Sequence, residues 1–373
     1  MSYIHEKSAW PHFRWDNAKL LPLLADVRHR QGRLLGRMQS LGFQLRTEAS
    51  LTTLTSDVLK SSAIEGELLD AQQVRSSIAR RLGIDFGESV ASNRDVDGVV
   101  EMMLDATQKY TKPLTAERLF GWHASLFPTG RSGMRRIAVG AWRPASAGPM
   151  QVVSGPIGRE KIHFEAPAAN RLKREVSAFL AWFEKTKEID PVLKAGLAHF
   201  WFVTIHPFED GNGRISRAIA DMALARAEGI AERFYSMSTQ IEAEKKQYYL
   251  NLEQSQKGGL DITSWLEWFL GCLGRAIEGA ETGLASVLRK ARTWERINHQ
   301  MQVNERQRKV INLLLDGFEG KLSSSKYAKL TKCSADTALR DIKLLVDQDV
   351  LIQEAGGGRN TCYRLAEPAA PPT

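Results

Sequence analysis

Cysteine is scarce in this sequence, and long hydrophobic runs are missing from it. Cys272, Cys333 and Cys362 lie far apart, and no CxxC pair occurs among the 373 residues. An odd, scattered set argues against a zinc site or a disulfide framework and favours thiols in a reducing compartment. No run approaches the roughly 18 apolar residues of a membrane-spanning helix, and the N-terminal MSYIHEKSAWPHFRW has no apolar signal core. We therefore expect a cytoplasmic protein without a membrane partner.

A strong excess of charge of one sign is also missing. The formal net charge of +8 and the pI near 9.3 suit a nucleotide, a nucleic acid or an acidic surface, but they select none of these partners. Hydrophobic residues make up 43% of the chain and charged residues 25%, as in soluble globular proteins. No internal repeat is visible, and the length exceeds that of one ordinary domain. We expect more than one domain.

Helical periodicity dominates the chain. The region 130–167 differs, because it is rich in Gly, Pro, Val and Ile, and VVSGPIGREKIHFEAP predicts a hairpin with a glycine turn. After Asn304, three helical stretches precede a strand, a glycine turn and a second strand, which is the order of a winged helix-turn-helix. The predicted fold is mainly α, a helical bundle with a β-hairpin and a small C-terminal winged helix domain.

The same patterns predict where the segments of the chain begin and end. A helical stretch that stops at Gly66 fits a helix with a C-terminal glycine cap. The predicted segments are an N-terminal helical region (1–110) with a helix at about 51–66, a central core (111–275) with the hairpin at about 151–167, a linker helix (276–303), the winged helix domain (304–366) and a disordered tail (367–373).

The stretch HPFEDGNGRISR, residues 206–217, brings several chemical functions together. His206 ends a helix-like apolar run and can act as a general base near neutral pH. Asp210 offers a carboxylate to a cation such as Mg²⁺, which often binds proteins through one or two carboxylates plus substrate phosphates. A lone histidine or a DGNG turn is commonly only structural, but these residues at this spacing together indicate a site.

The second half of the stretch indicates a place for an anion. Gly211 and Gly213 let backbone N–H groups turn towards an anion at the start of a helix. Arg214 and Arg217 share a face of that helix, where they oppose the helix dipole. A bound polyanion would explain that arrangement, so the stretch predicts a polyphosphate cradle with a metal ligand and a base beside it.

HPFEDGNGRISR resembles the signature of Fic-domain proteins, HxFx(D/E)GNGRxxR, and it matches every fixed position. SSAIEG, which begins at Ser61, resembles the inhibitory motif of the family, (S/T)xxxE(G/N). The two ends of the chain are similar to those of bacterial Fic proteins with an N-terminal inhibitory helix and a C-terminal winged helix. The resemblance implies a Fic fold and AMPylation, which is the transfer of AMP from ATP to a Ser, Thr or Tyr hydroxyl of a target protein.

The resemblance also implies roles for individual residues. His206 would accept the proton of the target hydroxyl, Asp210 would bind Mg²⁺ or Mn²⁺, and Asn212 would stabilise charge on the α-phosphate. Arg214 would hold the phosphate chain and Arg217 the γ-phosphate. The full set expected to bind ATP comprises Asp210, Gly211, Asn212, Gly213, Arg214, Ile215, Ser216, Arg217, Tyr248 and Tyr249, and Phe208 is expected to be structural.

Two further implications concern regulation and target docking. Ser61 and Glu65 would inhibit the enzyme, because a Glu65–Arg217 ion pair would occupy the space of the γ-phosphate. Glu67, two residues along, is expected on another face and without effect. In the hairpin, which corresponds to the target-docking flap of the family, the docking edge is expected to consist of Lys161, Ile162, His163 and Phe164.

Alternatives remain at this stage. The protein could be a DNA-binding regulator that senses nucleotide, or it could remove AMP or transfer another phosphate-containing group. In the winged domain Thr337, Arg340, Lys343 and Arg359 could contact nucleic acid, but acidic and basic residues there are nearly balanced. A protein partner for this domain and a homodimer also stay open.

Overall fold

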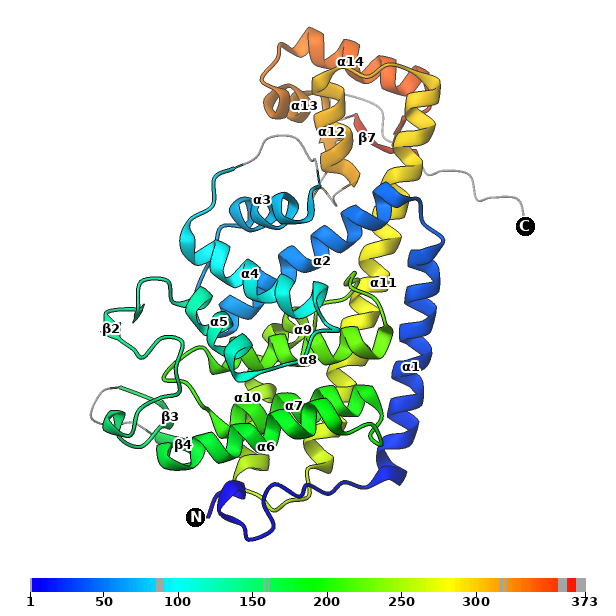
Figure 1. Ribbon diagram of the computed structural model, residues 1–373. Helices are drawn as coiled ribbons and strands as arrows, with labels where there is room; N and C mark the ends of the chain where they lie inside the picture. The colour runs from blue at the N-terminus through cyan, green and yellow to red at the C-terminus, as the bar shows by residue number, and fades with distance from the viewer. Residues whose placement is uncertain are drawn as a thin grey trace. The chain divides into compact units, whose positions relative to one another are not determined.

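The computed structural model divides the chain into two compact units, residues 1–281 and 282–373 (Figure 1). The boundary falls inside α11 (Thr263–Gln300), which is one continuous helix where the sequence indicated a helix followed by a separate linker helix. The structure describes residues 2–84, 90–156, 159, 161–315, 318, 321–354 and 361–366. The predicted tail (367–373) and Arg359 lie outside the described residues.

The described residues of the first unit form α-helices, short 3₁₀ turns and two small antiparallel hairpins. Its helices are α1 (Asn17–Gln39), α2 (Phe43–Ile64), α3 (Ala71–Leu82), α4 (Arg94–Gln108), α5 (Ala116–Leu126), α6 (Leu172–Lys185), α7 (Pro191–Ile205), α8 (Asn212–Glu228), α9 (Met237–Ala243), α10 (Lys245–Gln256) and the first part of α11. The hairpins are β1 (Arg131–Ser132) with β2 (Arg135–Arg136), and β3 (Gln151–Ser154) with β4 (Lys161–Glu165). The 3₁₀ turns are η1 (Ile4–Glu6), η2 (Ala145–Ala147) and η3 (Ala169–Arg171).

Helices α7 and α8 pack against each other at the centre of this unit (Figure 1). The α7 helix is buried almost all round, as its apolar sequence predicts. It begins at Pro191, a favourable first residue because proline lacks only an N–H that has no helical partner there, and Asp190 caps it by accepting a bond from Val192 N–H. The short loop between α7 and α8 contains the HPFEDG part of the motif, so two core helices fix both of its ends.

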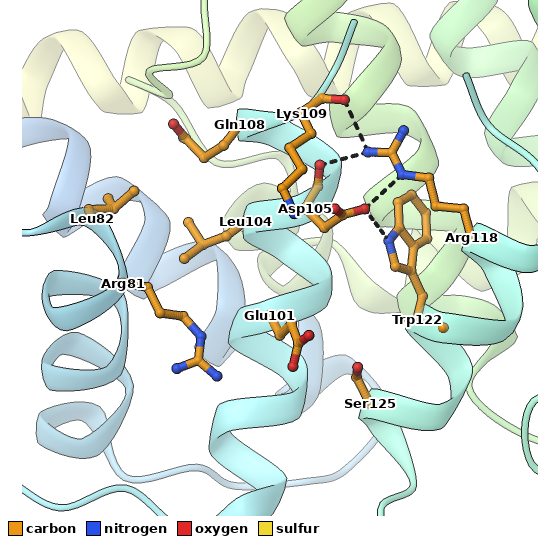
Figure 2. Close-up of a pocket in the computed structure, with 11 residues that line it drawn as sticks. Arg81, Leu82, Glu101, Leu104, Asp105, Gln108, Lys109, Arg118, Trp122 and Ser125 are labelled. Carbon is orange, nitrogen blue, oxygen red and sulfur yellow. Dashed lines mark hydrogen bonds and ion pairs between the residues drawn. The ribbon is translucent and has the colours of Figure 1, made fainter. Parts of the chain in front are cut away.

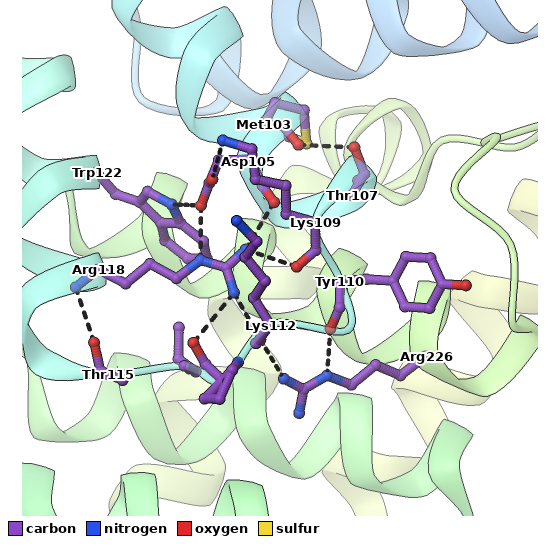
Figure 3. A network of polar contacts seen from close by, with 12 residues as sticks. Met103, Asp105, Thr107, Lys109, Tyr110, Lys112, Thr115, Arg118, Trp122 and Arg226 are labelled. Atoms are coloured by element: carbon purple, nitrogen blue, oxygen red, sulfur yellow. Dashed lines mark hydrogen bonds and ion pairs between the residues drawn. The ribbon is translucent and has the colours of Figure 1, made fainter.

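A polar network fastens the C-terminal end of α8 to the loop between α4 and α5 (Figure 3). Arg226 of α8 donates to the carbonyl oxygen of Tyr110 at 2.7 Å and to that of Lys112 at 2.9 Å. Arg118 of α5 donates to the Lys112 carbonyl at 2.8 Å and to the Asp105 carboxylate of α4 at 2.7 Å. Charge-assisted bonds of this kind are stronger than neutral ones, so this network keeps α4, α5 and α8 in register.

The N-terminal helix that carries the predicted inhibitory motif is longer than expected. It begins at Phe43 instead of at about residue 51, and it packs against α9 and α3 and across α8. Gly66 follows its end with a φ angle of +87°, in the left-handed region that glycine adopts readily. The residues after Gly66 therefore leave the helix in a new direction.

The second unit contains helices and a small sheet in the order predicted from the sequence. Its elements are α12 (Glu305–Leu315), β5 (Leu322–Ser323), α13 (Ser324–Thr331), α14 (Ala335–Asp347), β6 (Leu351–Gln353) and β7 (Cys362–Leu365). The strands pair antiparallel in the order β5-β7-β6, and β5 was not expected. Tyr327, Ile342 and Leu345 are among the side chains that form a core of its own. Within the described ranges, every helix of the chain is too short or too polar to span a membrane.

The close approach of α4 and α5 predicts the effect of a single methyl group. A Cβ atom added at Gly98 would lie 1.8 Å from the backbone oxygen of Ser125, whereas one added at Gly121 would meet nothing within 4 Å. We expect Gly98→Ala to lower the free energy of unfolding by about 1–3 kcal/mol, the usual cost of overpacking, because a backbone atom cannot move aside cheaply. Gly121→Ala is the control and should be neutral or slightly stabilising. Urea denaturation measures both, and equal midpoints would contradict this account.

Candidate active site

His206 ends α7 in a backbone conformation that is unusual for a histidine. Its φ and ψ angles are 51° and 58°, in the left-handed region that residues with a Cβ seldom occupy. Arg143 holds this conformation, because its Nε donates to the His206 carbonyl at 2.8 Å and its backbone N–H donates to the Pro207 carbonyl at 2.9 Å. Arg143 also bonds the Pro167 carbonyl after β4. Sequence reasoning missed Arg143, because nothing in its local sequence marks it.

The contacts of His206 define which ring nitrogen can accept a proton. Its Nδ1 lies 3.2 Å from the carbonyl oxygen of Val203, so Nδ1 carries the hydrogen and Nε2 presents a lone pair. Burial, the largest effect, lowers the pKa of His206 to about 4. The imidazole is therefore neutral at physiological pH and can accept a proton at Nε2.

Asn212 fastens the loop from the other side. Its Oδ1 accepts from the Phe208 N–H at 3.0 Å, and its Nδ2 donates to the Phe208 carbonyl at 2.9 Å. Phe208 is buried as expected and stacks on His123 with ring centroids 4.2 Å apart. The side chain of Asn212, expected at the α-phosphate, is thus used to close the loop. Its backbone N–H lies in the first turn of α8, where an anion would be favoured.

Two buried arginines follow in the first two turns of α8. Arg214 is 2% exposed and Arg217 is 1% exposed. Within the described part of the chain, Nε of Arg214 and Nη1 of Arg217 have no hydrogen-bond partner. A buried donor without a partner costs about 1–3 kcal/mol, more when it is charged, so each calls for an explanation. A bound anion that accepts these bonds would provide one.

Two carboxylates from the end of α2 neutralise these arginines. Glu65 accepts a bond from Arg217 Nη2 at 2.8 Å, and Ser61 accepts two more from Arg217, at its hydroxyl and its carbonyl. Glu67 accepts from Arg214 Nη1 at 2.5 Å. The expectation that Glu67 lies on another face is wrong, because the chain leaves the helix at Gly66 and no longer follows helical spacing.

The Glu65 carboxylate lies directly over the glycine-rich turn. A Cβ atom built on Gly213 would be 2.1 Å from Oε1 of Glu65 and 3.3 Å from Nη1 of Arg217. The carboxylate therefore lies beside the start of α8, where the backbone N–H groups and the helix dipole favour an anion. The residues fit a polyanion, and a carboxylate of the protein itself lies there.

Asp210, the predicted metal ligand, is held by neighbouring groups. One carboxylate oxygen accepts from the Gly211 N–H at 2.6 Å, and the other is bonded by the hydroxyl of Ser132 in β1. Among the described residues no three His, Cys, Asp or Glu side chains form a metal-binding cluster. A single carboxylate fits Mg²⁺ only if substrate phosphates and water complete the coordination. Ser132 had no signal in the sequence.

The other residues expected to bind ATP are placed in different surroundings. Ile215 is fully buried, and the hydroxyl of Ser216 donates to the Gly213 carbonyl at 2.8 Å, so both side chains serve the protein interior. Tyr248 is buried with its hydroxyl 3.0 Å from Nε2 of His199. Tyr249 is 40% exposed, and its hydroxyl lies 3.5 Å from the Ile64 carbonyl oxygen at the end of α2. Tyr249 is therefore the tyrosine of the pair with an accessible ring.

The predicted flap is the β3–β4 hairpin, apart from residues 157, 158 and 160, which lie outside the described residues. Lys161 and Ile162 are exposed, whereas Phe164 is 1% exposed and packs edge-on against Tyr3. The Phe164 side chain is thus part of the interior, and the expectation that Lys161, Ile162, His163 and Phe164 form a docking edge stays a prediction. Nδ1 of His163 lies 2.7 Å from the Glu253 carboxylate of α10, which ties the hairpin to the helical body.

A separate cavity of about 640 Å³ lies between α3, α4 and α5 (Figure 2). Its lining includes Arg81, Glu101, Lys109 and Trp122, and it contains none of the motif residues. Arg118, which lines this cavity, donates its N–H groups to the Asp105 carboxylate and to the backbone carbonyls of Lys112 and Asp105. His206 and Asp210 lie in the loop before α8, and the two buried arginines lie in the first turns of α8, so the candidate active site is there.

The geometry of this loop agrees with comparisons to known proteins. Residues 113–224 match the family model described as Fic/DOC family, and residues 3–84 match a domain of unknown function, DUF4172. The chain therefore contains a Fic/DOC family domain, whose range includes the loop and most of α8.

The relatives that have a named activity share a low sequence identity with this chain. Protein adenylyltransferase fic-1 of Caenorhabditis elegans is 27% identical over 205 residues, 54% of this chain and 37% of that protein. Protein adenylyltransferase Fic of Drosophila mojavensis is 26% identical over 226 residues, 59% of this chain and 40% of the relative. The matched region thus spans well under half of each of these relatives.

Solved structures share the fold. A Fic family protein from Desulfovibrio desulfuricans superposes with a TM-score of 0.53 at 22% identity, over 94% of this chain and 97% of that one. A Fic domain containing signaling protein from Bacteroides thetaiotaomicron has a TM-score of 0.52 at 17% identity, over 70% and 98%. At these identities the likeness establishes the fold alone.

The buried histidines around the site predict a loss of stability in acid. Burial, the largest effect, lowers the pKa of His123 to about 4 and that of His199 to about 3. The unfolded chain binds these protons near pH 6.5 while the folded protein does not, so stability falls as pH drops from 6.5 towards 4. Each histidine should remove roughly 1 kcal/mol between pH 7 and 5.5.

Urea denaturation at several pH values checks this prediction. His199→Gln should flatten the dependence of the unfolding free energy on pH, whatever its effect at pH 7. His12→Gln, a change at an exposed histidine, should leave that dependence as it is. A slope that is identical in wild type and His199→Gln would show that His199 does not titrate between the two states.

Proposed function

We propose that this protein is a protein adenylyltransferase, which transfers AMP from ATP to a Ser, Thr or Tyr hydroxyl of a target protein and of itself. One observation carries the proposal. A neutral imidazole with an accepting Nε2, at His206, lies in the loop that leads directly to two buried arginines with unpartnered donors. A sensor of nucleotide would need the arginines but not the base. The names of the relatives support the same reaction class.

The reaction needs a proton acceptor and a held phosphate. Nε2 of His206 accepts the proton of the target hydroxyl as its oxygen attacks the α-phosphorus of ATP. The new bond joins that oxygen to phosphorus, the bond to the β-phosphate oxygen breaks, and pyrophosphate leaves. The lowered pKa of His206 keeps the acceptor unprotonated at neutral pH. The bonds of Arg143 and Asn212 keep the loop in one geometry, so little reorganisation is required.

The phosphates of ATP would take the place of the two carboxylates. Arg214 and Arg217 would donate to the phosphate chain, and the first N–H groups of α8 would stabilise its charge. Mg²⁺ or Mn²⁺, held by Asp210 together with the phosphates, would supply positive charge for the leaving pyrophosphate. The exposed ring of Tyr249 is suited to contact the adenine.

In the proposed resting state Glu65 and Glu67 are competitive anions. Each carboxylate bonds an arginine that the phosphates also need, so productive ATP binding requires that α2 or its end moves. The two ion pairs hold their arginines with different strength. Glu65 and Ser61 together give Arg217 three bonds, whereas the Glu67 side chain is 46% exposed and solvent screens its pair with Arg214. Glu65 is therefore the stronger brake and Glu67 the weaker one.

The second unit offers a surface for a partner. Helix α14, which would be the recognition helix of a winged helix domain, exposes Arg340 and Lys343 but also Leu339 at 51% and Leu344 at 48%. Exposed leucines do not bind phosphates, and apolar side chains on a surface commonly mark protein contacts. These residues favour a protein partner over DNA for this unit.

The assay that tests the proposal uses labelled ATP and the variant Glu65→Gly, which lacks the proposed inhibitory carboxylate. We expect label on protein, and His206→Ala in the same background should reduce transfer by roughly a hundredfold to ten-thousandfold while ATP still binds. Removal of divalent metal by a chelator should stop transfer, and Mg²⁺ or Mn²⁺ should restore it. His29→Ala, a change at an exposed histidine of α1, is the control. Undiminished transfer by folded His206→Ala would rule out the mechanism.

The two-carboxylate brake predicts graded release. Glu65→Gly should raise AMP transfer strongly, on the order of a hundredfold, because misplaced phosphates cost about that much in rate. Glu67→Gln should raise it less, and the double variant more than either. Glu117→Gln, an exposed position on α5, should change nothing.

Transfer rates at saturating ATP separate these variants. If Glu67→Gln matches wild type, the Glu67–Arg214 pair does not restrain the enzyme. If Glu65 instead orients water to remove AMP, Glu65→Gly will retain label on a modified substrate that wild type clears with time.

A further inference from the structure

The β1–β2 hairpin is an exposed, basic element beside the active-site loop. Its strands pair Arg131 with Arg136 and Ser132 with Arg135, and Met134 at its turn is 94% exposed. Nη1 of Arg131 donates to the Met134 carbonyl at 2.9 Å, which helps to hold the turn. Met134 thus presents its side chain almost wholly to solvent between arginine side chains.

Bonds to the active-site loop fix this hairpin in place. Arg135 pairs with the Glu209 carboxylate at 2.7 Å, and the same carboxylate accepts from the Ala138 N–H at 2.7 Å. The hydroxyl of Ser132 bonds Asp210. Glu209 and Asp210 follow His206 by three and four residues, so a target that brings a hydroxyl to His206 must approach this neighbourhood.

The segment that contains both hairpins is mainly basic. Between Thr129 and Glu165 the sequence contains six lysine and arginine residues and two acidic residues, Glu160 and Glu165. The exposed basic side chains are Arg131, Arg135, Arg136, Arg159 and Lys161, which come from both hairpins. The two hairpins project at the left edge of the helical unit in Figure 1. Among the described residues, no carboxylate pairs with Arg131 or Arg136.

We infer that the target protein carries an acidic segment next to its acceptor hydroxyl, and that the β1–β2 hairpin binds this segment. Arg131 and Arg136 would pair with its carboxylates and Met134 would be an apolar anchor. The inference rests on the proposed function and adds the chemistry of the protein substrate. Complementary charge of this kind steers association and selects partners.

The side chains exposed on the two hairpins favour a protein partner over a nucleic acid or a nucleotide. Met134, Val153 at 48% exposure and Ile162 at 44% exposure accompany the basic side chains. Exposed apolar residues with methionine and arginine are typical of protein interfaces, whereas a surface that binds nucleic acid depends chiefly on phosphate contacts. ATP has its own buried donors at Arg214 and Arg217, so it does not need Arg131 or Arg136.

Peptide substrates test this inference in the full-length Glu65→Gly variant. Two peptides share one threonine and the same length, and they differ only in Asp and Glu flanks against Asn and Gln flanks. We expect kcat/KM for AMP transfer to the acidic peptide to be about tenfold higher, since each exposed ion pair contributes a factor of roughly 1.5 to 5. The preference should shrink at high salt.

Charge reversal assigns the preference to the hairpin. Arg131→Glu with Arg136→Glu should abolish or invert it without changing the KM for ATP, and Met134→Ser should weaken transfer to both peptides. Lys173→Glu on α6, an exposed basic residue away from the loop, should preserve the preference. A preference that survives the double reversal would overturn the assignment.

Self-labelling of the Glu65→Gly variant distinguishes failure of the proposed function from failure of the inference about an acidic substrate. If Glu65→Gly labels neither itself nor either peptide, the proposed function fails. If it labels itself and both peptides equally well, the reaction stands and the inference about an acidic substrate is wrong. If a short DNA duplex binds through Arg131 and Arg136 while the acidic peptide gains nothing, the hairpin is a nucleic-acid site and the inference is overturned.

Discussion

Two buried guanidinium groups at the start of one helix set the constraint on which the rest of the site depends. Arg214 and Arg217 lie in the first turns of α8, where the helix dipole is positive and water is nearly excluded. Positive charge in such a place is costly without a partner anion. The protein provides Glu65 and Glu67, and ATP would provide its phosphates. In the proposed function, ATP and these carboxylates would compete for the same N–H donors.

The loop before α8 is rigid for a related reason. It holds His206, Asp210 and the start of α8 in one arrangement, although His206 adopts a left-handed backbone conformation. The Asn212 side chain closes the loop on Phe208, and Arg143 bonds the His206 carbonyl. These bonds hold His206 in a backbone conformation that residues with a Cβ atom seldom adopt. A site preorganised in this way is suited to stabilise charge that develops during a reaction.

The same loop connects the chemistry to the surface. Glu209 and Asp210 bond the β1–β2 hairpin, and Arg143 reaches from the His206 carbonyl to Pro167 at the end of the flap. Both hairpins are therefore attached to the residues that would act on a target. Their basic and apolar side chains are exposed while Arg214 and Arg217 are buried, so in the proposed function a protein and a nucleotide would be recognised by different residues.

Local sequence determined the features that depend on spacing along the chain. The motif put Arg214 and Arg217 on one face of α8, SSAIEG placed Ser61 and Glu65 one helical turn apart, and the glycine turn predicted the flap hairpin. Helical geometry and turn chemistry act over a few residues, so these features could be predicted without knowledge of the fold.

Tertiary structure decided what depends on which elements meet. Glu67 reaches Arg214 because the left-handed Gly66 turns the chain off its helix, and Ser132 and Arg143 reach the loop from positions more than sixty residues away in sequence. The side chain of Phe164 is buried against Tyr3, which lies far away in the sequence. Contacts between distant residues are set by the packing of whole helices, and no local pattern of residues encodes that packing.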